Sequence, residues 1–275
     1  MNDDGTIGPH IDYQGRIDQG FVSGNSGNHG DHVAGIIMGA GNKDPDAVGM
    51  ATGSFLYVYN VWDAVDFIDT YYYNPGIRIT STSYGNGCNA GYTAYARQAD
   101  KDVRELPSLM HVFSAGNSGT SDCGYGAGSG WGNITGGIKA GKNVMAIGNL
   151  NDLDALSNSS SRGPSADGRI KPDICAVGTT VWSTIDVNDY ASFSGTSMAC
   201  PGVSGVMAQL YQAYKENNSG NEPKSGLIKA MLMNGADDLG NVGPDYKFGW
   251  GRMNALRSVE MIENNQFSVN TVDQG

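Results

Sequence analysis

The segment Gly195-Thr196-Ser197-Met198-Ala199 carries the side chain best suited to nucleophilic chemistry. Ser197 stands between a Gly-Thr turn and a run in which apolar residues recur every three or four positions, so its hydroxyl lies at the start of a predicted helix. Free backbone N–H groups and the helix dipole at such a place can stabilise a developing oxyanion. Serine is a poor nucleophile at neutral pH, so it needs a nearby base and a group that orients that base.

Four histidines are available as the base. His111 lies inside an apolar strand pattern, and an apolar run follows His32, so both favour packing roles. His10 lies in a polar loop. His29 opens a predicted helix and is accessible to a neighbouring side chain, which makes it the best candidate. Taken alone, it is more simply interpreted as a helix cap or a surface residue.

Strand and helix patterns alternate along the chain. Strands are predicted at Phe55–Trp62, Ile77–Tyr84, Met110–Ala115, Val144–Leu150, Ile174–Val177, Val181–Thr184 and Tyr190–Phe193. Helices are predicted at His29–Met38, Ala64–Tyr71, Ala90–Leu106, Ser197–Lys215 and Lys224–Met233. This order predicts an α/β fold in three layers, with a mostly parallel central sheet and helices on both faces. Functional groups of such folds collect where the strands end.

Length and charge narrow the function classes. A chain of 275 residues fits one α/β domain. Its formal net charge of −11 disfavours nucleic acid and anionic lipid as partners. No apolar run is long enough to cross a membrane. The first residues, Met1–Gly5, have neither the basic region nor the apolar core of a signal peptide, which predicts a cytoplasmic chain or a processed piece of a longer one.

The four cysteines form no C-x-x-C pair, which argues against a zinc ribbon or a thioredoxin-like redox site. Cys88 and Cys123 lie in polar, Gly-rich segments, where a disulfide and two free thiols are equally plausible. Cys175 lies in an apolar run and is predicted to be a buried free thiol. For Cys200, which follows Ser197 closely, both states remain open.

Several separated motifs resemble those of the subtilisin-like serine peptidases, the subtilase family. His29–Gly35 resembles its H-G-T-H-V-A-G motif, and Gly195–Pro201 matches G-T-S-M-A-x-P. Ala115-Gly116-Asn117 matches its A-G-N motif, and Asp3-Asp4-Gly5 matches D-x-G. The resemblance extends over about residues 3–262 and implies the same three-layer fold. Further similar stretches are Ser160–Pro164, Lys171–Asp173 and Gly249–Ala255.

The resemblance implies a role for each matching residue. Ser197 would be the nucleophile, and His29 would take its proton and pass it to the leaving amine. Asp3 would orient His29, with Asp4 as the rival for that role. Asn117 would donate its side-chain amide to the oxyanion.

The same resemblance implies where substrate binds. Ser83, Tyr84 and Gly85 would form one wall of the primary specificity pocket, and Ser114, Ala115 and Gly116 the other. Small residues in these walls predict an apolar or aromatic side chain before the scissile bond. The pocket floor is expected within residues 123–132, whose many glycines leave its shape open.

The start of the chain departs from the family pattern. We expect a single peptidase domain over residues 1–275 that lacks the first core strand, with residues 263–275 as an extension or linker. Asp3 would then lie on a fraying terminus and orient His29 poorly. Earlier residues, another segment at the sheet edge, or low activity would each account for this. Asp31 replaces the usual Thr, and its carboxylate is expected to raise the pKa of His29.

Calcium is common in this family, although catalysis there needs no cofactor. Asp12 matches a family position that often binds calcium. Asn42, Asp44 and Asp46 form an oxygen-rich loop suited to the same ion, while a solvated polar loop is the simpler interpretation.

The leading functional prediction is a serine endopeptidase acting on protein or peptide. An acyl-transfer ligase or macrocyclase would use the same residues, and a binding module with a disabled triad is the non-enzymatic alternative. The resemblance also implies a secreted, extracellular protein made with an N-terminal pro-segment as its partner.

Overall fold

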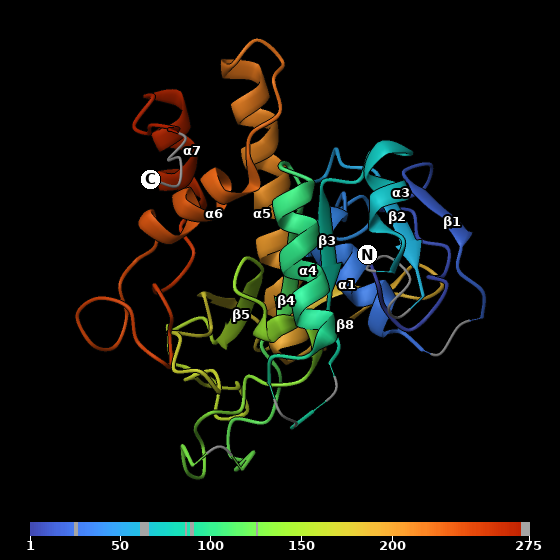
Figure 1. Cartoon of the computed structure of the whole chain (residues 1–275). Coiled ribbons are helices and arrows are strands. Elements are labelled where there is room, and N and C mark those ends of the chain that lie inside the picture. Colours follow the sequence, from blue (N-terminus) through green and yellow to red (C-terminus); the bar gives the residue numbers. More distant parts are fainter. Residues whose placement is uncertain (25–26, 61–65, 86, 89–90, 125, 271–275) are drawn as a thin grey trace.

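A parallel β-sheet forms the centre of the fold, as the alternating patterns predict (Figure 1). The computed structural model describes residues 1–24, 27–60, 66–85, 87–88, 91–124 and 126–270. The strands are β1 (Ile17–Phe21), β2 (Leu56–Tyr59), β3 (Ile79–Thr82), β4 (Met110–Ser114), β5 (Met145–Leu150), β6 (Ile174–Val177), β7 (Val181–Ile185) and β8 (Asp189–Phe193). The helices are α1 (His29–Met38), α3 (Ile68–Tyr73), α4 (Ala94–Glu105), α5 (Thr196–Asn217), α6 (Ser225–Asn234) and α7 (Ala255–Glu263), with 3₁₀ turns η1 (Pro45–Ala47) and η2 (Gly137–Ala140).

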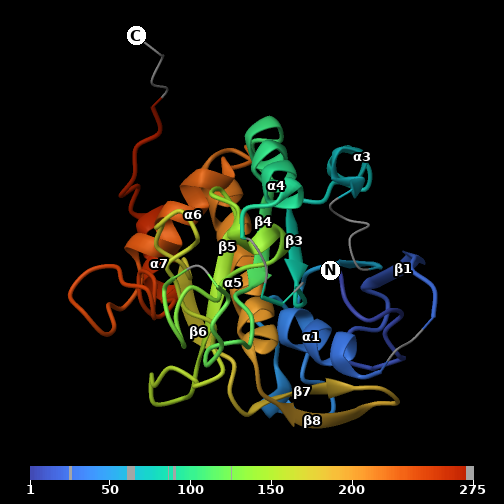
Figure 2. The same cartoon turned by 60° about the horizontal axis from the view of Figure 1, so that its bottom comes forward.

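Asn2 joins two parts of the sheet. Strands β3, β4, β5 and β6 pair in that order, and β1 pairs with β2, all in parallel. Asn2 forms parallel bridges to Tyr59 of β2 and to Thr82 of β3. A residue pair at the start of the chain therefore occupies the strand position between β2 and β3. The antiparallel hairpin of β7 and β8 lies apart from this sheet, beside α1 (Figure 2).

Helices cover both faces of the sheet because side chains alternate along each strand. Met110 and Val112 of β4 belong to one cluster with buried residues of α5 and α6. Phe113, the residue after Val112, points to the opposite face and packs against Ala99 of α4. The expected three-layer α/β architecture is therefore confirmed.

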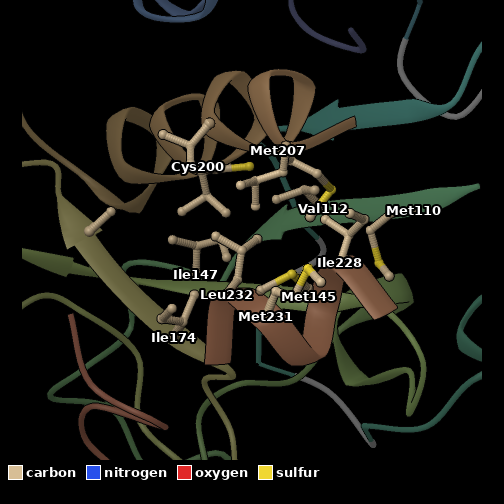
Figure 3. Packing of buried hydrophobic residues seen from close by; sticks show 14 of the residues in the cluster. Met110, Val112, Met145, Ile147, Ile174, Cys200, Met207, Ile228, Met231 and Leu232 are labelled. Carbon is tan, nitrogen blue, oxygen red and sulfur yellow. The ribbon is translucent and has the colours of Figure 1, made fainter. Parts of the chain in front are cut away.

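The largest apolar cluster lies between the sheet and helices α5, α6 and α7. Figure 3 shows Val112, Met145 and Ile147 of the strands facing Cys200 and Met207 of α5. All five side chains are fully buried. Such packing fixes α5 against β4 and β5, because a close-packed core transmits position from one element to the next.

Predicted and observed bounds agree most closely for α1, β6 and the start of α5. Helix α1 and strand β6 have the predicted bounds, and α5 begins one residue earlier than predicted. Strand β1 and helix α7 were not predicted. Parts of three predicted elements, at residues 61–62, 64–65 and 90, lie outside the described residues.

The predicted states of the cysteines can be compared with the structure. Cys88 and Cys123 form a disulfide, while Cys175 and Cys200 are free and buried. The prediction for Cys175 is confirmed, and the alternatives for the other three are resolved. In the part of the chain described, no helix is long and apolar enough to cross a membrane.

Candidate active site

Asp3 and His29 form the closest pair at the site. Nδ1 of His29 lies 2.6 Å from Oδ1 of Asp3. The Asp3 side chain is only 3% exposed, whereas His29 is 37% exposed. A carboxylate can only accept, so Nδ1 carries the proton in this pair and Nε2 is left as the acceptor. The exposed ring can thus receive a proton from a neighbour while Asp3 fixes its orientation.

The sheet holds Asp3 in place, contrary to the expected fraying terminus. The Asn2 N–H donates to Ser81 O at 3.0 Å, and Tyr59 N–H donates to Met1 O at 2.9 Å. Asn2 is fully buried. Because Met1 and Asn2 form hydrogen bonds with the strands on both sides, these two residues are enough to occupy the strand position between β2 and β3. Asp3 therefore follows the end of a strand, as the family pattern requires.

Asp4 has a different task from Asp3. Its Oδ1 accepts from Gly30 N–H at 2.9 Å and its Oδ2 from His29 N–H at 3.3 Å. These are N–H groups in the first turn of α1, which the helix itself cannot satisfy. Asp4 therefore caps the N-terminus of α1, although it lies outside that helix. Of the two carboxylates, only that of Asp3 forms a hydrogen bond with the His29 ring. The sequence motif presents Asp4 only as a rival for Asp3, so this capping role was missed. The feature of the sequence that indicates it is the pair of adjacent carboxylates, of which only one is needed to orient His29.

Two carboxylates raise the pKa of His29. Burial by itself lowers the pKa of the imidazole, but the hydrogen bond and charge of Asp3 and the charge of Asp4 raise it above its ordinary value. Asp31 does not take part as expected. Its Oδ1 instead accepts from Gly8 N–H at 2.7 Å and from the Tyr13 hydroxyl at 3.2 Å.

The remaining histidines lie away from this pair. His32 is fully buried, and its Nε2 lies 3.0 Å from both Val181 O and Ala191 O. Burial lowers its pKa to about 4. His111 is buried on β4, with Nδ1 2.7 Å from the Thr80 hydroxyl. The predicted packing roles of both are confirmed.

Ser197 lies in the first turn of α5, but its hydroxyl points to another acceptor. Oγ of Ser197 donates to Ser83 O at 3.0 Å, and Oγ of Ser83 donates back to Ser197 O at 2.9 Å. Within the described residues, no hydrogen bond joins Ser197 to His29. The structure therefore brings Asp3 to His29 but leaves Ser197 bonded to Ser83. Transfer of the Ser197 proton to His29 requires the hydroxyl to leave Ser83 O.

Asn117 is oriented by the start of α5. Its Oδ1 accepts from the N–H and from the hydroxyl of Thr196, each at 3.0 Å. Since the oxygen faces Thr196, Nδ2 points the other way. A Cβ atom added to Gly195 would stand 3.3 Å from this Nδ2 and 3.7 Å from Ser197 N, so both nitrogens border one small space. Two donors next to one space suit an oxyanion. Thr196 was missed as the orienting residue, although it precedes Ser197 in the motif.

The expected substrate-binding residues follow two neighbouring strands. Ser83, Tyr84 and Gly85 come directly after β3, and Ser114 ends β4 ahead of Ala115 and Gly116. Strands β3 and β4 pair in parallel, so both segments emerge at the same edge of the sheet. Ser114 and Ala115 are buried, while Gly85 is exposed. The disulfide joins Cys88, beyond the first segment, to Cys123, beyond the second.

Donors of the protein already occupy two of the four residues predicted to bind calcium, Asp12 and Asp44. Asp12 accepts from Asn42 N–H at 2.7 Å and from the Tyr190 hydroxyl at 3.0 Å. Asp44 accepts from Asp46 N–H at 3.0 Å and from Trp182 Nε1–H at 2.9 Å. No group of three or more potential metal ligands occurs among the described residues. These side chains therefore form no ready-made calcium site as arranged, and binding would require Asp12 or Asp44 to release a donor; calcium stays a prediction.

Known proteins resemble the chain in sequence and fold. Thermitase from Thermoactinomyces vulgaris is 29% identical over 274 residues, covering 94% of this chain and 86% of thermitase. A thermophilic serine proteinase from Bacillus sp. strain AK1 is 28% identical over 272 residues, and the match covers 94% of this chain but 60% of that protein. The structure of the prenylagaramide maturation protease PagA superposes with a TM-score of 0.76 at 22% identity, covering 95% of this chain and 92% of PagA.

A family model decides the assignment. The subtilase family model matches residues 9–251, which include His29, Asn117 and Ser197 and leave Asp3 outside the match. Asp3 therefore joins the site on the evidence of its geometry. The matched range covers most of the 275 residues. The chain belongs to the subtilase family of serine peptidases.

Proposed function

We propose that the protein is a serine endopeptidase that hydrolyses peptide bonds through an acyl-enzyme on Ser197. The observation that carries this proposal is the short hydrogen bond between Asp3 and His29, formed between segments far apart in sequence. A protonated Nδ1 held by Asp3 leaves Nε2 of His29 as a general base. The oriented amide of Asn117 supplies the electrostatic part of the site.

The chemical steps follow from these positions. The Ser197 hydroxyl leaves Ser83 O, and its proton passes to His29 Nε2 as Oγ attacks the scissile carbonyl carbon. The resulting oxyanion accepts hydrogen bonds from Asn117 Nδ2 and Ser197 N–H. His29 then gives its proton to the leaving amine as the C–N bond breaks. Water repeats the sequence on the acyl-enzyme and releases the new carboxylate.

A fluorophosphonate probe and casein test this function together. The wild-type protein should be labelled and should cleave casein, whereas Ser197→Ala should do neither. Loss of a triad nucleophile costs about 10⁶ in kcat, so the contrast is large. Ser192, which is exposed on β8, offers a matched Ser→Ala control that should retain both properties. Correctly folded wild-type protein that takes up no probe would contradict the proposal.

Two alternatives use the same fold. A ligase would pass the acyl group to an amine, and it predicts amide products by mass spectrometry when a peptide amine is added. A binding module with a disabled triad drew its support from a loosely held Asp3. The hydrogen bonds of Asn2 and Met1 to the sheet remove that support.

We further propose that the protein functions outside the cell and is made with a pro-segment. The Cys88–Cys123 disulfide supports an oxidising compartment. Mass spectrometry of the protein from its natural host tests this location: the disulfide and a trimmed N-terminus in the culture medium are expected. Reduced protein confined to cell extracts would contradict it.

A further inference from the structure

Lys139 is a buried lysine whose ammonium group has no partner among the residues that the structure describes. It lies in η2, and its residue is only 5% exposed. Within the part of the chain that the structure describes, no hydrogen bond or ion pair reaches its ammonium group. Burial lowers its pKa to about 8, and no neighbouring charge contributes to that shift. The other buried lysine of the described residues, Lys171, does not share this state, since it lies 2.5 Å from an oxygen of Asp173.

The ammonium group of Lys139 lies between the two predicted walls of the specificity pocket. A Cβ atom added to Gly85 would stand 2.6 Å from Lys139 Nζ, and one added to Gly116 would stand 2.9 Å from it. Gly85 ends the segment after β3 and Gly116 ends the segment after β4. Glycine at both positions leaves the room that Nζ occupies. The expected apolar pocket therefore contains a positive charge.

The cavity at this place is small. It measures about 10 Å³ and is lined in part by Tyr84, Gly136 and Lys139. Nζ thus fills space that an entering side chain would need. An apolar side chain there would cover the ammonium and remove its remaining access to water, which is unfavourable for an unpaired charge, and the cation–π attraction of an aromatic ring would offset only part of that cost. A carboxylate would instead form a charge-assisted hydrogen bond with Nζ.

The fold alone does not account for this lysine. A buried charge without a partner destabilises the folded state, and an apolar residue of similar length would avoid that cost. The chain has 28 acidic residues against 17 lysines and arginines, yet no described acidic side chain pairs with Lys139. An anionic ligand can supply the counter-charge that the described residues do not.

We propose that Lys139 is a specificity-determining residue that selects an acidic side chain, Glu or Asp, immediately before the scissile bond. This inference rests on the proposed endopeptidase function. It replaces the apolar or aromatic preference that the small wall residues predict. Discrimination arises because Glu satisfies the ammonium, while the isosteric Gln leaves it without a counter-charge.

Four peptide substrates that differ only before the scissile bond, as Glu, Asp, Gln or Phe, test the proposal. For the wild-type protein, kcat/KM should be at least about 10-fold higher for Glu than for Gln, because a site built around a buried polar group rejects analogues that leave it unpaired. That ratio should fall as pH rises through about 8, where Lys139 loses its charge. A wild-type protein that cleaves the Phe or Gln peptide as fast as the Glu peptide would overturn the inference without the need for a variant.

Lys139→Met assigns the preference to this residue. The variant should lose the Glu-over-Gln ratio and gain activity on Phe, while melting no lower than the wild type because an unpaired charge has been removed. Lys142→Met is the matched control, since Lys142 is exposed three residues along the same segment, and it should keep the wild-type ratio. An unchanged ratio in Lys139→Met would overturn the proposal. Fluorophosphonate labelling distinguishes the failure of the specificity proposal from the failure of the proposed function. Labelled protein that prefers the Phe peptide would contradict only the preference for an acidic residue. Folded protein that takes up no label would contradict the endopeptidase function itself.

Discussion

His29 Nδ1 and Asp3 Oδ1 lie 2.6 Å apart, and this contact connects the centre of the sheet to the start of α1. Asp3 is held because Asn2 bridges β2 and β3. His29 is held because Asp4 accepts the first N–H groups of its helix. Two adjacent carboxylates therefore position one imidazole, the first through the ring and the second through the backbone.

Asp3→Asn should abolish most of the activity and leave the fold intact. An amide can no longer hold the required tautomer of His29, and the equivalent change in a serine-protease triad lowers kcat by about 10⁴-fold. Asp4→Ala is the comparison, because it should cost about 1 kcal/mol of stability through the lost helix cap while reducing kcat far less. Steady-state kinetics and thermal melting separate the two. A larger loss of kcat in Asp4→Ala than in Asp3→Asn would show that the assignment is reversed.

The pH profile should reflect the raised pKa of His29. Only neutral imidazole can accept the Ser197 proton, so kcat/KM should rise through a pKa above the ordinary value of about 6.5. Because the charge of Asp4 contributes to the shift, the acidic limb of Asp4→Ala should move to lower pH. The free energy of unfolding should change in the opposite direction to kcat/KM. The pairing of protonated His29 with Asp3 stabilises the fold fully below about pH 6.5, and this contribution is lost as pH rises through the raised pKa. An acidic limb that is identical in the two proteins would contradict this account.

Asn117 should contribute to the rate of the chemical step and little to binding. Loss of one oxyanion donor costs about 10²–10³ in kcat, which is the expected effect of Asn117→Ala with KM nearly unchanged. Asn117→Asp retains the oxygen that accepts from Thr196 but loses the Nδ2 donors, so it should also be slow while remaining folded. Asn241→Ala, at an exposed position between α6 and α7, should behave as the wild type. Recovery of activity in Asn117→Asp would assign the residue a purely structural role.

The sequence predicts those parts of the fold and site that local patterns encode. The almost continuous apolar run of α1 after His32 and the short apolar run of β6 indicate their bounds. The motifs around His29, Asn117 and Ser197 place these residues where strands end and helices begin. Strand β1 escapes prediction because it is a half-exposed strand containing Gly20, with little alternation to recognise.

Long-range relationships account for what the sequence could not predict. The segment around Asn2 is too short to show periodicity. Its strand position becomes visible only through the bridges of Asn2 to β2 and β3. Nothing in the sequence distinguishes Lys139 from other lysines in Gly-rich segments. Its position is informative only because the fold places Gly85 and Gly116 beside its ammonium group. The hydrogen bond from Ser197 to Ser83 likewise depends on a side-chain rotamer that no motif specifies.

The calcium prediction has a direct measurement. A calcium ion held by Asp12 and the loop of Asn42, Asp44 and Asp46 predicts that EDTA lowers the melting temperature and that added Ca²⁺ restores it. Binding would require Asp12 to release Asn42 N–H or the Tyr190 hydroxyl, so Asp12→Asn should melt lower and lose its response to EDTA. A wild-type melting temperature that is unchanged by EDTA would remove calcium from the description of this protein.

Reduction of the Cys88–Cys123 disulfide should weaken the fold around the substrate-binding segments. The bond spans 35 residues, and closing a loop of that length stabilises a protein by about 3–4 kcal/mol through the entropy of the unfolded chain. A reductant such as TCEP should therefore lower the melting temperature, whereas the double variant Cys88→Ser, Cys123→Ser should melt lower from the start and show no further response. Thiol titration provides the independent check, because Cys175 and Cys200 are both buried. The native protein should react with no thiol reagent, and the denatured, unreduced protein should react at two positions; four reactive thiols would show that the disulfide is absent.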